Sequence, residues 1–181
     1  KSYSNVLILD YGYFACNKKI VNLINSSKKN IIINCQANSY NFGFNIFTKY
    51  KKSKLMCIDE QEFRLAFKNK NDLVFDLFNK NKKTLDMYKI FIVTLGKQGC
   101  AIRFKKKNYF IPTVFKNALD TIGCGDIFIT LFALLSISKS FNIQNSAIVS
   151  HIAAGIHANE YGNSQSIDFI KLFRTIDNIL K

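Results

Sequence analysis

Residues 120–126 read Asp120-Thr121-Ile122-Gly123-Cys124-Gly125-Asp126, and an apolar run from Ile127 to Leu135 follows them directly. A glycine-rich turn that opens a buried helix directs several backbone N–H groups toward one point, where the helix dipole adds positive potential. The turn is therefore a predicted site for an anion such as a phosphate. Asp126 lies at the start of the same helix and is a candidate base. Phosphoryl transfer to a hydroxyl requires an anion site and a base close together. The alternative is an aspartate N-cap on a core helix, with glycines for a tight turn.

Short apolar runs alternate with helical patterns along the chain. The runs predict buried strands at 6–9, 31–33, 55–58 and 90–94, and an antiparallel edge pair at 100–104 and 108–111. The helical patterns cover 17–27, 60–67, 71–79, 126–138, 143–159 and 167–180. This order predicts an α/β fold with a mostly parallel sheet and helices on both faces. Because no repeat or low-complexity linker interrupts it, residues 1–181 are expected to form a single domain.

The topology also predicts where a site would lie. In an open α/β sheet, ligands bind at the carboxyl ends of the strands. The loops after Asp10, Asn34, Ile58 and Thr94 are therefore expected to share one rim with the glycine turn.

Composition narrows the class of protein. The chain has 181 residues, 48% of them apolar, with a single proline, which favours an ordered domain with a sizeable core. Its five cysteines are odd in number and lack C-x-x-C spacing, which argues against a disulfide framework or a zinc site. We therefore expect reduced thiols and a cytoplasmic protein. The longest apolar run, Ile127 to Ile137, is too short to span a bilayer, so no membrane partner is expected.

The net charge of +14 is compatible with nucleic-acid binding. The lysines are scattered along the chain, however, and no basic platform with interleaved aromatic residues is evident. We therefore expect no nucleic-acid partner.

The string at 120–126 closely resembles the D-T-x-G-A-G-D signature of the ribokinase/PfkB family of sugar kinases, with Cys124 where alanine is usual. Cysteine is small and apolar, so the backbone cradle should survive this change. The resemblance implies a three-layer α/β/α ribokinase-like (Rossmann-like) fold and ATP-dependent phosphorylation of a sugar or sugar-phosphate hydroxyl. It further implies that Gly123, Cys124 and Gly125 bind the γ-phosphate and that Asp126 takes the proton from the acceptor.

Two further segments are similar to nucleotide-binding parts of the family. Residues 93–99 are similar to its T-L-G-x-x-G segment, which implies that Thr94, Gly96 and Gly99 contact ATP; a strand-turn-strand corner is the alternative. His151 lies 11 residues before Gly162, a spacing similar to the family's end region. The nucleotide contacts that this implies are Thr121, His151, Ala154, Gly155 and Gly162. The alternative for His151 is a histidine packed in the interior.

The resemblance also implies metal sites. Asp59-Glu60-Gln61-Glu62 occupies the place of the family's N-x-x-E motif, so Asp59 and Glu62 would hold Mg²⁺ through hard oxygen ligands. The alternative is that these acidic residues open the helix 60–67, where its dipole favours them. Asp120 and Ser166 would contribute to a site for a monovalent cation such as K⁺.

The segments expected to bind the acceptor are similar to one branch of the family, the heptose-phosphate kinases. Asp10-Tyr11-Gly12 is similar to the D-Y-G-K-G turn of heptose-phosphate kinases, with Tyr13 and Phe14 in place of Lys-Gly, and Asn34-Cys35-Gln36 stands where those enzymes often carry D-P-K. The residues that would contact the sugar are Asp10, Asn34 and Asn38.

The resemblance covers nearly the whole chain and corresponds to the C-terminal, nucleotide-binding portion of the family. The family's N-terminal part and its small β-sheet lid are missing, so we expect the chain to be a fragment. Two alternatives stay open: a non-catalytic nucleotide-binding domain, and the kinase half of a bifunctional ADP-heptose-type nucleotide-sugar synthase. Expected partners are the sugar and ATP, and a homodimer is compatible with the resemblance.

Overall fold

The computed structural model describes residues 3–13, 15–115, 117–138, 141–160 and 166–180. The strands are β1 (Asn5–Asp10), β2 (Asn30–Cys35), β3 (Ser53–Asp59), β4 (Tyr88–Thr94), β5 (Gly99–Phe104) and β6 (Lys107–Pro112). The α-helices are α1 (Lys18–Ser26), α2 (Glu60–Ala66), α3 (Val74–Lys80), α4 (Lys82–Leu85), α5 (Cys124–Ile137), α6 (Ile143–Ala158) and α7 (Phe169–Leu180). Short 3-10 helices, η1 and η2, span Phe47–Lys49 and Gly96–Gln98.

The strands form one sheet in the order β1-β2-β3-β4-β5-β6. Neighbouring strands from β1 to β4 pair in parallel. β5 and β6 are neighbours joined only by Lys105 and Lys106, whose φ angles are 49° and 64°. Positive φ at both positions is typical of the two-residue turn that joins antiparallel strands. The predicted α/β class, parallel core and antiparallel edge pair are therefore confirmed.

One predicted helix begins at a different residue, and one helix was not predicted. Helix α3 begins at Val74 instead of residue 71, because Asn69 Oδ1 accepts hydrogen bonds from the N–H groups of Asn71 and Asp72 and holds that segment in a turn. The short helix α4 was not predicted, since its four residues contain one apolar side chain and show no helical period.

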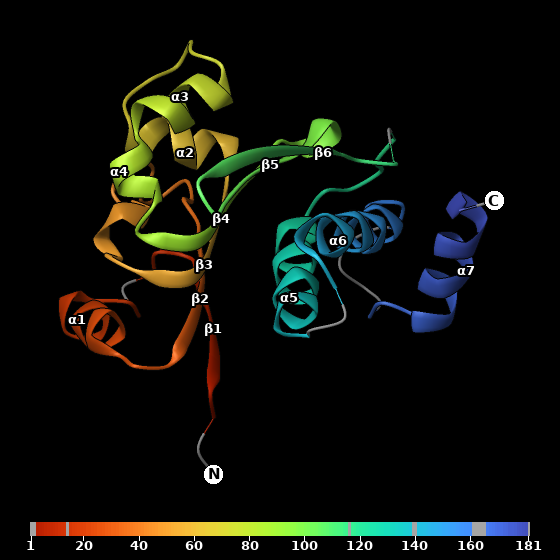
Figure 1. The fold of residues 1–181 in the computed structure, drawn as a ribbon, viewed down its shortest axis with the longest axis horizontal. Helices are drawn as coiled ribbons and strands as arrows, with labels where there is room; N and C mark the ends of the chain where they lie inside the picture. The colour runs from red at the N-terminus through yellow and green to blue at the C-terminus, as the bar shows by residue number, and fades with distance from the viewer. Residues whose placement is uncertain (1–2, 14, 116, 139–140, 161–165, 181) are drawn as a thin grey trace. The chain divides into compact units, whose positions relative to one another are not determined.

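The chain divides into two compact units, the first comprising Lys1–Leu95 and Ala101–Phe110 and the second Gly96–Cys100 and Ile111–Lys181. In the first unit, α1 to α4 lie along strands β1 to β4 (Figure 1). Their side chains pack on one face of the sheet, and four phenylalanines form the centre of that core. These residues are Phe47, Phe63, Phe78 and Phe91.

The register of the parallel strands places their carboxyl ends at one edge. Asp10 lies opposite Cys35 in the β1–β2 pair, and Asp59 lies opposite Thr94 in the β3–β4 pair. The predicted shared rim is confirmed for these four strand ends. The glycine turn belongs to the second unit, so its place at the same rim stays a prediction.

The second unit is mainly helical. Helix α5 packs against α6, and α6 packs against α7, as the blue-green and blue ribbons of Figure 1 show. Ile152, Ala153 and Ile156 of α6 and Leu172 of α7 form its buried cluster. None of the helices in the described part of the chain is long and apolar enough to cross a membrane. All five cysteines are free thiols, as expected.

Candidate functional site

The glycine turn begins helix α5. Gly123 is the N-cap and adopts the left-handed conformation, with φ 78°, which glycine tolerates because it lacks a Cβ atom. Asp126 lies in the first turn of the 14-residue helix. A Cβ atom added at Gly125 would meet no atom of the described residues within 4 Å. Packing by the described residues therefore does not require a glycine at this position.

One of the predicted donors already has a partner. The N–H of Cys124 donates to the carbonyl of Thr121 over 3.2 Å, and the Ile122 N–H donates to Asp120 Oδ1 over 2.9 Å. These bonds shape the turn before the helix begins. A bound anion would have to share the Cys124 donor or replace its partner.

The end of α6 anchors this turn. The N–H groups of Leu119 and Asp120 donate to the carbonyl of Ala158 over 2.7 and 3.0 Å. His157 Nε2 lies 3.0 Å from the carbonyl oxygen of Ile122, and the Cys124 thiol donates to the Ala154 carbonyl over 3.5 Å. His157 was not predicted as a site residue, although a histidine within the apolar helical pattern of residues 143–159 was the available signal.

His151 lies inside the second unit. Its ring centroid is 4.7 Å from that of Phe128, and burial lowers its pKa to about 4, so the ring is neutral at pH 7. This is the interior packing that the sequence left as an alternative. Its Nε2 atom is buried and has no hydrogen-bond partner among the described residues. An unsatisfied buried nitrogen of this kind is costly unless a ligand or water bonds to it.

Packing explains two of the predicted nucleotide-binding glycines. A Cβ atom at Gly155 would lie 2.3 Å from the Phe115 ring, and one at Gly99 would lie 2.1 Å from the carbonyl oxygen of Ile111. Gly96, with φ 54°, has no described residue within 4 Å of the place where its Cβ atom would be. Thr94 Oγ1 donates to the Ile58 carbonyl over 3.4 Å. Contact of these residues with a nucleotide stays a prediction.

The second unit also has a cavity of about 430 Å³, which is lined by residues that precede α5 and by residues of or next to α6 and α7. Its lining residues are Val114, Phe115, Asn117, Ile156, Asn159, Lys171 and Thr175. His151, Ala154 and Gly155, the predicted adenine contacts, are not among them.

Asp59 and Glu62 form a capping box at the start of α2. Asp59 Oδ1 accepts from the Glu62 N–H over 2.7 Å, and Glu62 Oε2 accepts from the Asp59 N–H over 2.8 Å. Glu62 Oε1 accepts from the Ala37 N–H over 2.7 Å, so this carboxylate also holds the loop after β2. Helix capping, the alternative to a metal site, is therefore confirmed for both residues.

Capping does not remove the acidic character of this pair. Burial, and then the charge of Asp59, raises the pKa of Glu62 to about 7, and burial raises the pKa of Asp59. The described residues contain no cluster of three or more His, Cys, Asp or Glu side chains that could hold a metal ion. A metal at this place would have two protein carboxylates at most, which is compatible with Mg²⁺ because that ion keeps several waters and substrate oxygens.

The predicted acceptor contact Asp10 is buried and has several donors, including the Cys35 thiol at 3.7 Å. Its carboxylate accepts from the Gly12 N–H over 3.0 Å and from the Tyr50 hydroxyl over 2.8 Å, and it pairs with Lys49 Nζ at 2.6 Å. Burial acts to raise the pKa of Asp10, but the hydrogen bonds from Lys49 and Tyr50 outweigh it and hold that pKa below its ordinary value. The buried Asp10 carboxylate therefore connects the loop after β1, through Gly12, to Lys49 and Tyr50.

The other predicted acceptor contacts are also bonded within the rim. Asn34 is buried and donates to the Cys57 carbonyl over 3.1 Å. Asn38 Nδ2 donates to the Tyr11 carbonyl over 2.5 Å. Asn41 and Asn45, which the sequence analysis missed, donate to the carbonyls of Gly12 and Gln36 over 3.0 and 2.8 Å. The recurrence of asparagine at 34, 38, 41 and 45 was the available signal.

Both residues predicted to bind a monovalent cation lie in the described part of the chain. Asp120 Oδ1 accepts from the Ile122 N–H, and Ser166 is exposed. Gly162, predicted to contact the nucleotide, lies outside the described residues.

A parallel α/β sheet and a glycine-started helix with an aspartate in its first turn are features of phosphate-binding α/β proteins. The chain belongs to the pfkB family of carbohydrate kinases, whose model matches residues 18–168. The predicted family is therefore confirmed.

Solved ribokinases share the fold. The ribokinase of Thermotoga maritima superposes with a TM-score of 0.73 at 19% identity, over 97% of this chain and 57% of that protein. The Arabidopsis thaliana ribokinase, solved with ribose and ATP, superposes with a TM-score of 0.70 at 16% identity, over 88% of this chain and 51% of that protein. Both comparisons confirm the predicted ribokinase-like fold.

Among curated relatives, the bifunctional protein HldE of a Nitratiruptor species is 31% identical over 169 residues. That match covers 90% of this chain and 34% of the relative. The chain thus spans about a third of the length of the curated relatives it matches.

Proposed function

We propose that this chain transfers the γ-phosphate of ATP to a hydroxyl group of a sugar or sugar phosphate. The observation that carries the proposal is the start of α5, where Gly123 in the left-handed conformation precedes a helix with Asp126 in its first turn. Membership of a carbohydrate kinase family supports the sugar as acceptor. The Arabidopsis ribokinase was solved with ribose and ATP, which supports ATP as the donor.

In this mechanism the helix start stabilises charge and the aspartate moves a proton. The N–H groups of Gly123, Cys124 and Gly125, together with the dipole of α5, would stabilise the negative charge that develops on the transferred phosphoryl group. Asp126 would accept the proton of the acceptor hydroxyl as that oxygen attacks. The open space beside Gly125 is compatible with this assignment, because no described residue fills the region next to this predicted phosphate-binding residue.

We assign Mg²⁺ to Asp59 and Glu62. Two carboxylates fit this ion, and the raised pKa of Glu62, about 7, indicates an acidic group that a cation would stabilise in its ionised form. When bound, Mg²⁺ would neutralise charge on the phosphates of ATP. The assignment is compatible with the capping box because each carboxylate oxygen has a second lone pair.

The proposed nucleotide contacts in the described part of the chain are Thr94, Gly96, Gly99, Thr121, His151, Ala154 and Gly155. The buried Nε2 atom of His151 supports this role, because its hydrogen-bonding capacity is not used by any described residue. Asp120 and Ser166 are proposed to bind K⁺.

The experiment is phosphate transfer from γ-labelled ATP with Mg²⁺ to a panel of sugars and sugar phosphates, with the product separated from ATP. The proposal predicts label in one class of acceptor and ADP formation that depends on it. If the chain binds ATP but labels no acceptor, it is the non-catalytic nucleotide-binding domain that is the first alternative.

A second candidate is the kinase part of a bifunctional nucleotide-sugar enzyme. Two observations favour it: the Asp10-Tyr11-Gly12 turn, which is similar to that of heptose-phosphate kinases, and the similarity to proteins named bifunctional HldE, of which the chain spans 34%. The same assay tests it, since label would then enter a heptose phosphate in preference to pentoses and hexoses.

A further inference from the structure

The parallel strands β2, β3 and β4 begin side by side at one edge of the sheet. Ser53, the first residue of β3, lies opposite Tyr88, the first residue of β4. Ile32 of β2 lies opposite Leu55 of β3, so Asn30, the first residue of β2, is level with Ser53. Asn30, Ser53 and Tyr88 therefore form a row across the sheet, at the opposite ends of the strands from the shared rim. We name this row and the segments that lead into it the amino-terminal edge.

The turn between β5 and β6 belongs to the same edge. Only residues 95–98 separate β4 from its neighbour β5, a connection too short for parallel strands, so the two strands run in opposite directions. The end of β5 therefore lies beside the start of β4. The 2.7 Å contact between Arg103 Nε and Asp86 Oδ1 agrees with this, because Arg103 is the residue before the end of β5 and Asp86 lies two residues before β4.

Hydrogen bonds join the segments of the amino-terminal edge to one another. The Tyr88 hydroxyl donates to the Tyr50 carbonyl over 2.6 Å, which joins the start of β4 to the segment before β3. The N–H of Lys51 donates to Asn25 Oδ1 over 2.8 Å, which joins that segment to the last turn of α1. Helix α1 in turn leads into β2. These segments therefore form one surface of the first unit.

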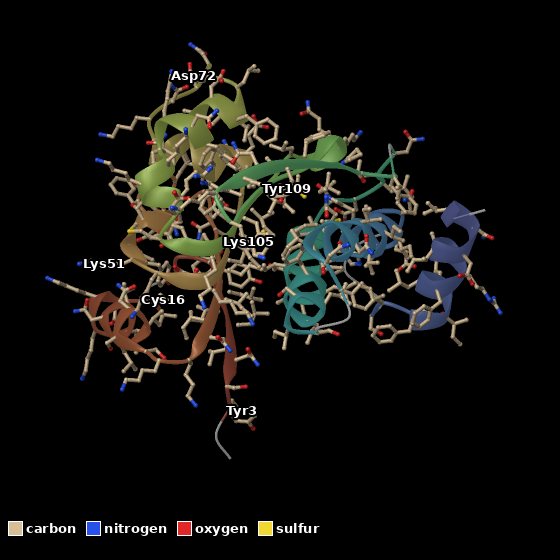
Figure 2. All side chains as sticks on the ribbon, viewed as in Figure 1. Tyr3, Cys16, Lys51, Asp72, Lys105 and Tyr109 are labelled. Atoms are coloured by element: carbon tan, nitrogen blue, oxygen red, sulfur yellow. The ribbon has the colours of Figure 1, made fainter. Side chains whose placement is uncertain are left out.

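Ten exposed lysines lie on the amino-terminal edge. They precede β2 and β3 directly, lie on α4 and at the start of β4, or form the turn into β6. They are Lys28, Lys29, Lys51, Lys52, Lys82, Lys83, Lys89, Lys105, Lys106 and Lys107. Figure 2 labels Lys51, before β3, and Lys105, in the turn after β5. These lysines are scattered along the sequence, and the register of the sheet brings them to one edge.

Carboxylates do not neutralise this charge. Asp86 is the only acidic residue in the described segments that carry the ten lysines, which are 28–30, 51–54, 82–89 and 105–107. Its carboxylate pairs with Arg103. The ion pairs between described residues include none of the ten lysines. Lys29 Nζ donates to the Tyr3 carbonyl, which is a neutral partner. A concentration of one sign of charge attracts polyanions.

The shape of the amino-terminal edge fits the backbone of a nucleic-acid duplex. From β2 to β6 the edge spans four strand spacings, which is about 20 Å. A DNA duplex of this length carries about a dozen phosphate charges, since it has one for about every 1.7 Å. Lysine binds a phosphate as a point charge and needs no fixed geometry. A row of lysines can therefore follow phosphates without reading bases.

Two features favour a duplex over a single strand or a membrane surface. Proteins that bind single strands present exposed aromatic rings on which bases stack, and the one aromatic residue in the four lysine-bearing segments, Tyr88, is buried. Attachment to a membrane surface gains from apolar side chains that insert between lipids, and Met87 is the only exposed large apolar residue in these described segments. The phosphates on the outside of a duplex require neither.

We propose that the amino-terminal edge binds double-stranded nucleic acid through its phosphate backbone, without preference for sequence. No nucleic-acid partner was expected from the sequence because the lysines are scattered along the chain, and their alignment in the sheet removes that reason. The bound duplex lies at the opposite ends of the strands from Asp10 and Asp59, so this surface is distinct from the proposed sites for the acceptor and for Mg²⁺.

Fluorescence anisotropy with the full chain, in the absence of ATP, tests the proposal. The probe is a fluorescein-labelled DNA duplex of mixed sequence, and it is titrated at several KCl concentrations. We expect a dissociation constant between about 1 and 100 µM at physiological salt. If about five lysines contact phosphates, the slope of log K against log[KCl] should be about −4 to −5. A duplex of unrelated sequence should bind within about twofold.

Two paired substitutions locate the binding. Lys51→Gln with Lys52→Gln removes two charges before β3, and Lys105→Gln with Lys107→Gln removes two charges at the β5–β6 turn. Each pair should weaken binding about tenfold or more and make the salt slope less steep by about one or two. Retained circular dichroism checks that each variant is folded.

The matched control is Lys18→Gln with Lys19→Gln. These exposed lysines begin α1, which follows the carboxyl end of β1 and therefore starts at the opposite end of the strands. The control loses the same net charge as each test pair. Its affinity for the duplex should stay within about threefold.

Several results would overturn the proposal. Equal weakening by the control pair would show that binding follows the net charge of the whole chain. Tighter binding of a single strand of the same length would show a stacking site instead. Vesicles of phosphatidylcholine with phosphatidylserine that bind the chain when the duplex does not would assign the amino-terminal edge to a membrane surface. Because these measurements contain no ATP, their failure leaves the proposed function unchanged.

Discussion

His157 Nε2 lies 3.0 Å from the carbonyl oxygen of Ile122, although the two residues are 35 positions apart in the chain. This contact joins the last turn of α6 to the segment that leads into Gly123. Together with the two N–H bonds to the Ala158 carbonyl, it holds the glycine turn at the end of α6. The predicted phosphate site is therefore positioned by a helix other than the one that it begins.

Replacing His157 should loosen the glycine turn. His157→Leu removes the bond to Ile122, and we expect a loss of about 0.5–1.5 kcal/mol in the free energy of unfolding and a several-fold weaker affinity for ATP. Urea denaturation and calorimetric titration measure the two effects. Asn159→Ala is the matched control, because its Nδ2 donates to the Gly155 carbonyl over 2.8 Å and does not touch the turn. Equal ATP affinity in the two variants would count against this role of His157.

Two glycine substitutions should behave in opposite ways. Gly125→Ala adds a side chain in open space, so stability should hold or rise by up to about 1 kcal/mol, while ATP affinity should fall because the methyl group would occupy the phosphate position. Gly155→Ala would place a Cβ atom 2.3 Å from the Phe115 ring and should cost about 1–3 kcal/mol. Thermal unfolding and ATP titration of both variants are the measurement. Unchanged ATP affinity in Gly125→Ala would remove that residue from the phosphate site.

Glu62 should titrate near pH 7. Its pKa is raised from 4.5 to about 7 by burial and by Asp59, so the folded chain keeps a proton that the unfolded chain has released between those values. The contribution of this group to stability is therefore fully present below about pH 4.5 and is lost as the pH rises through about 7.

Carboxyl ¹³C chemical shifts measured against pH follow this group directly. If Mg²⁺ binds at Asp59 and Glu62, its addition with an ATP analogue should lower the midpoint of the Glu62 titration. A midpoint near 4.5 without Mg²⁺ would contradict the burial of this carboxyl. A midpoint that Mg²⁺ does not change would contradict the metal assignment.

Removing the Tyr50 hydroxyl should lower the free energy of unfolding more than removing the Tyr88 hydroxyl does. The Tyr50 hydroxyl donates to the charged Asp10 carboxylate over 2.8 Å, whereas the Tyr88 hydroxyl donates to the neutral Tyr50 carbonyl over 2.6 Å. We expect Tyr50→Phe to cost about 1.5–3 kcal/mol and Tyr88→Phe about 0.5–1.5 kcal/mol, as is typical of charged and neutral acceptors. Loss of the Tyr50 donor should also raise the pKa of Asp10. Equal costs in denaturant unfolding would show that the charge of Asp10 adds nothing to this bond.

The elements that could be predicted from sequence are those determined by residues that are close together in the chain. The run Ile31 to Ile33 in β2 is buried, as expected for an inner strand of a parallel sheet that is covered on both faces. The run in β1, at the end of the sheet, was also found from its apolar residues, but Val6 and Leu7 are exposed and not buried as predicted. The glycine turn could also be predicted from neighbouring residues, because Gly123 directly precedes the apolar helix and adopts the left-handed conformation there. The start of α3 was wrong because a side chain of Asn69 competes for the backbone of the following residues.

The parts of the site that could not be predicted depend on distant partners. Asp10 was predicted to contact the acceptor, and the sequence does not reveal that Tyr50, 40 residues away, donates to its carboxylate. Glu62 looked like a metal ligand, and its bond to the Ala37 N–H, 25 residues away, adds a structural role. Gly99 and Gly155 looked like nucleotide contacts, and their immediate neighbours are Ile111 and Phe115. These contacts depend on partners that are distant in the sequence, which local patterns do not reveal, and ligand binding by these residues stays a prediction.

The most direct test of the account is the effect of Asp126→Asn on phosphate transfer to the best acceptor. The substitution removes the base and keeps the size and polarity of the side chain. We predict that turnover falls about 10²–10⁴-fold while the affinity for ATP stays within a few-fold. Near-normal turnover by the Asn variant would show that the acceptor proton leaves by another route and would contradict the role assigned to Asp126.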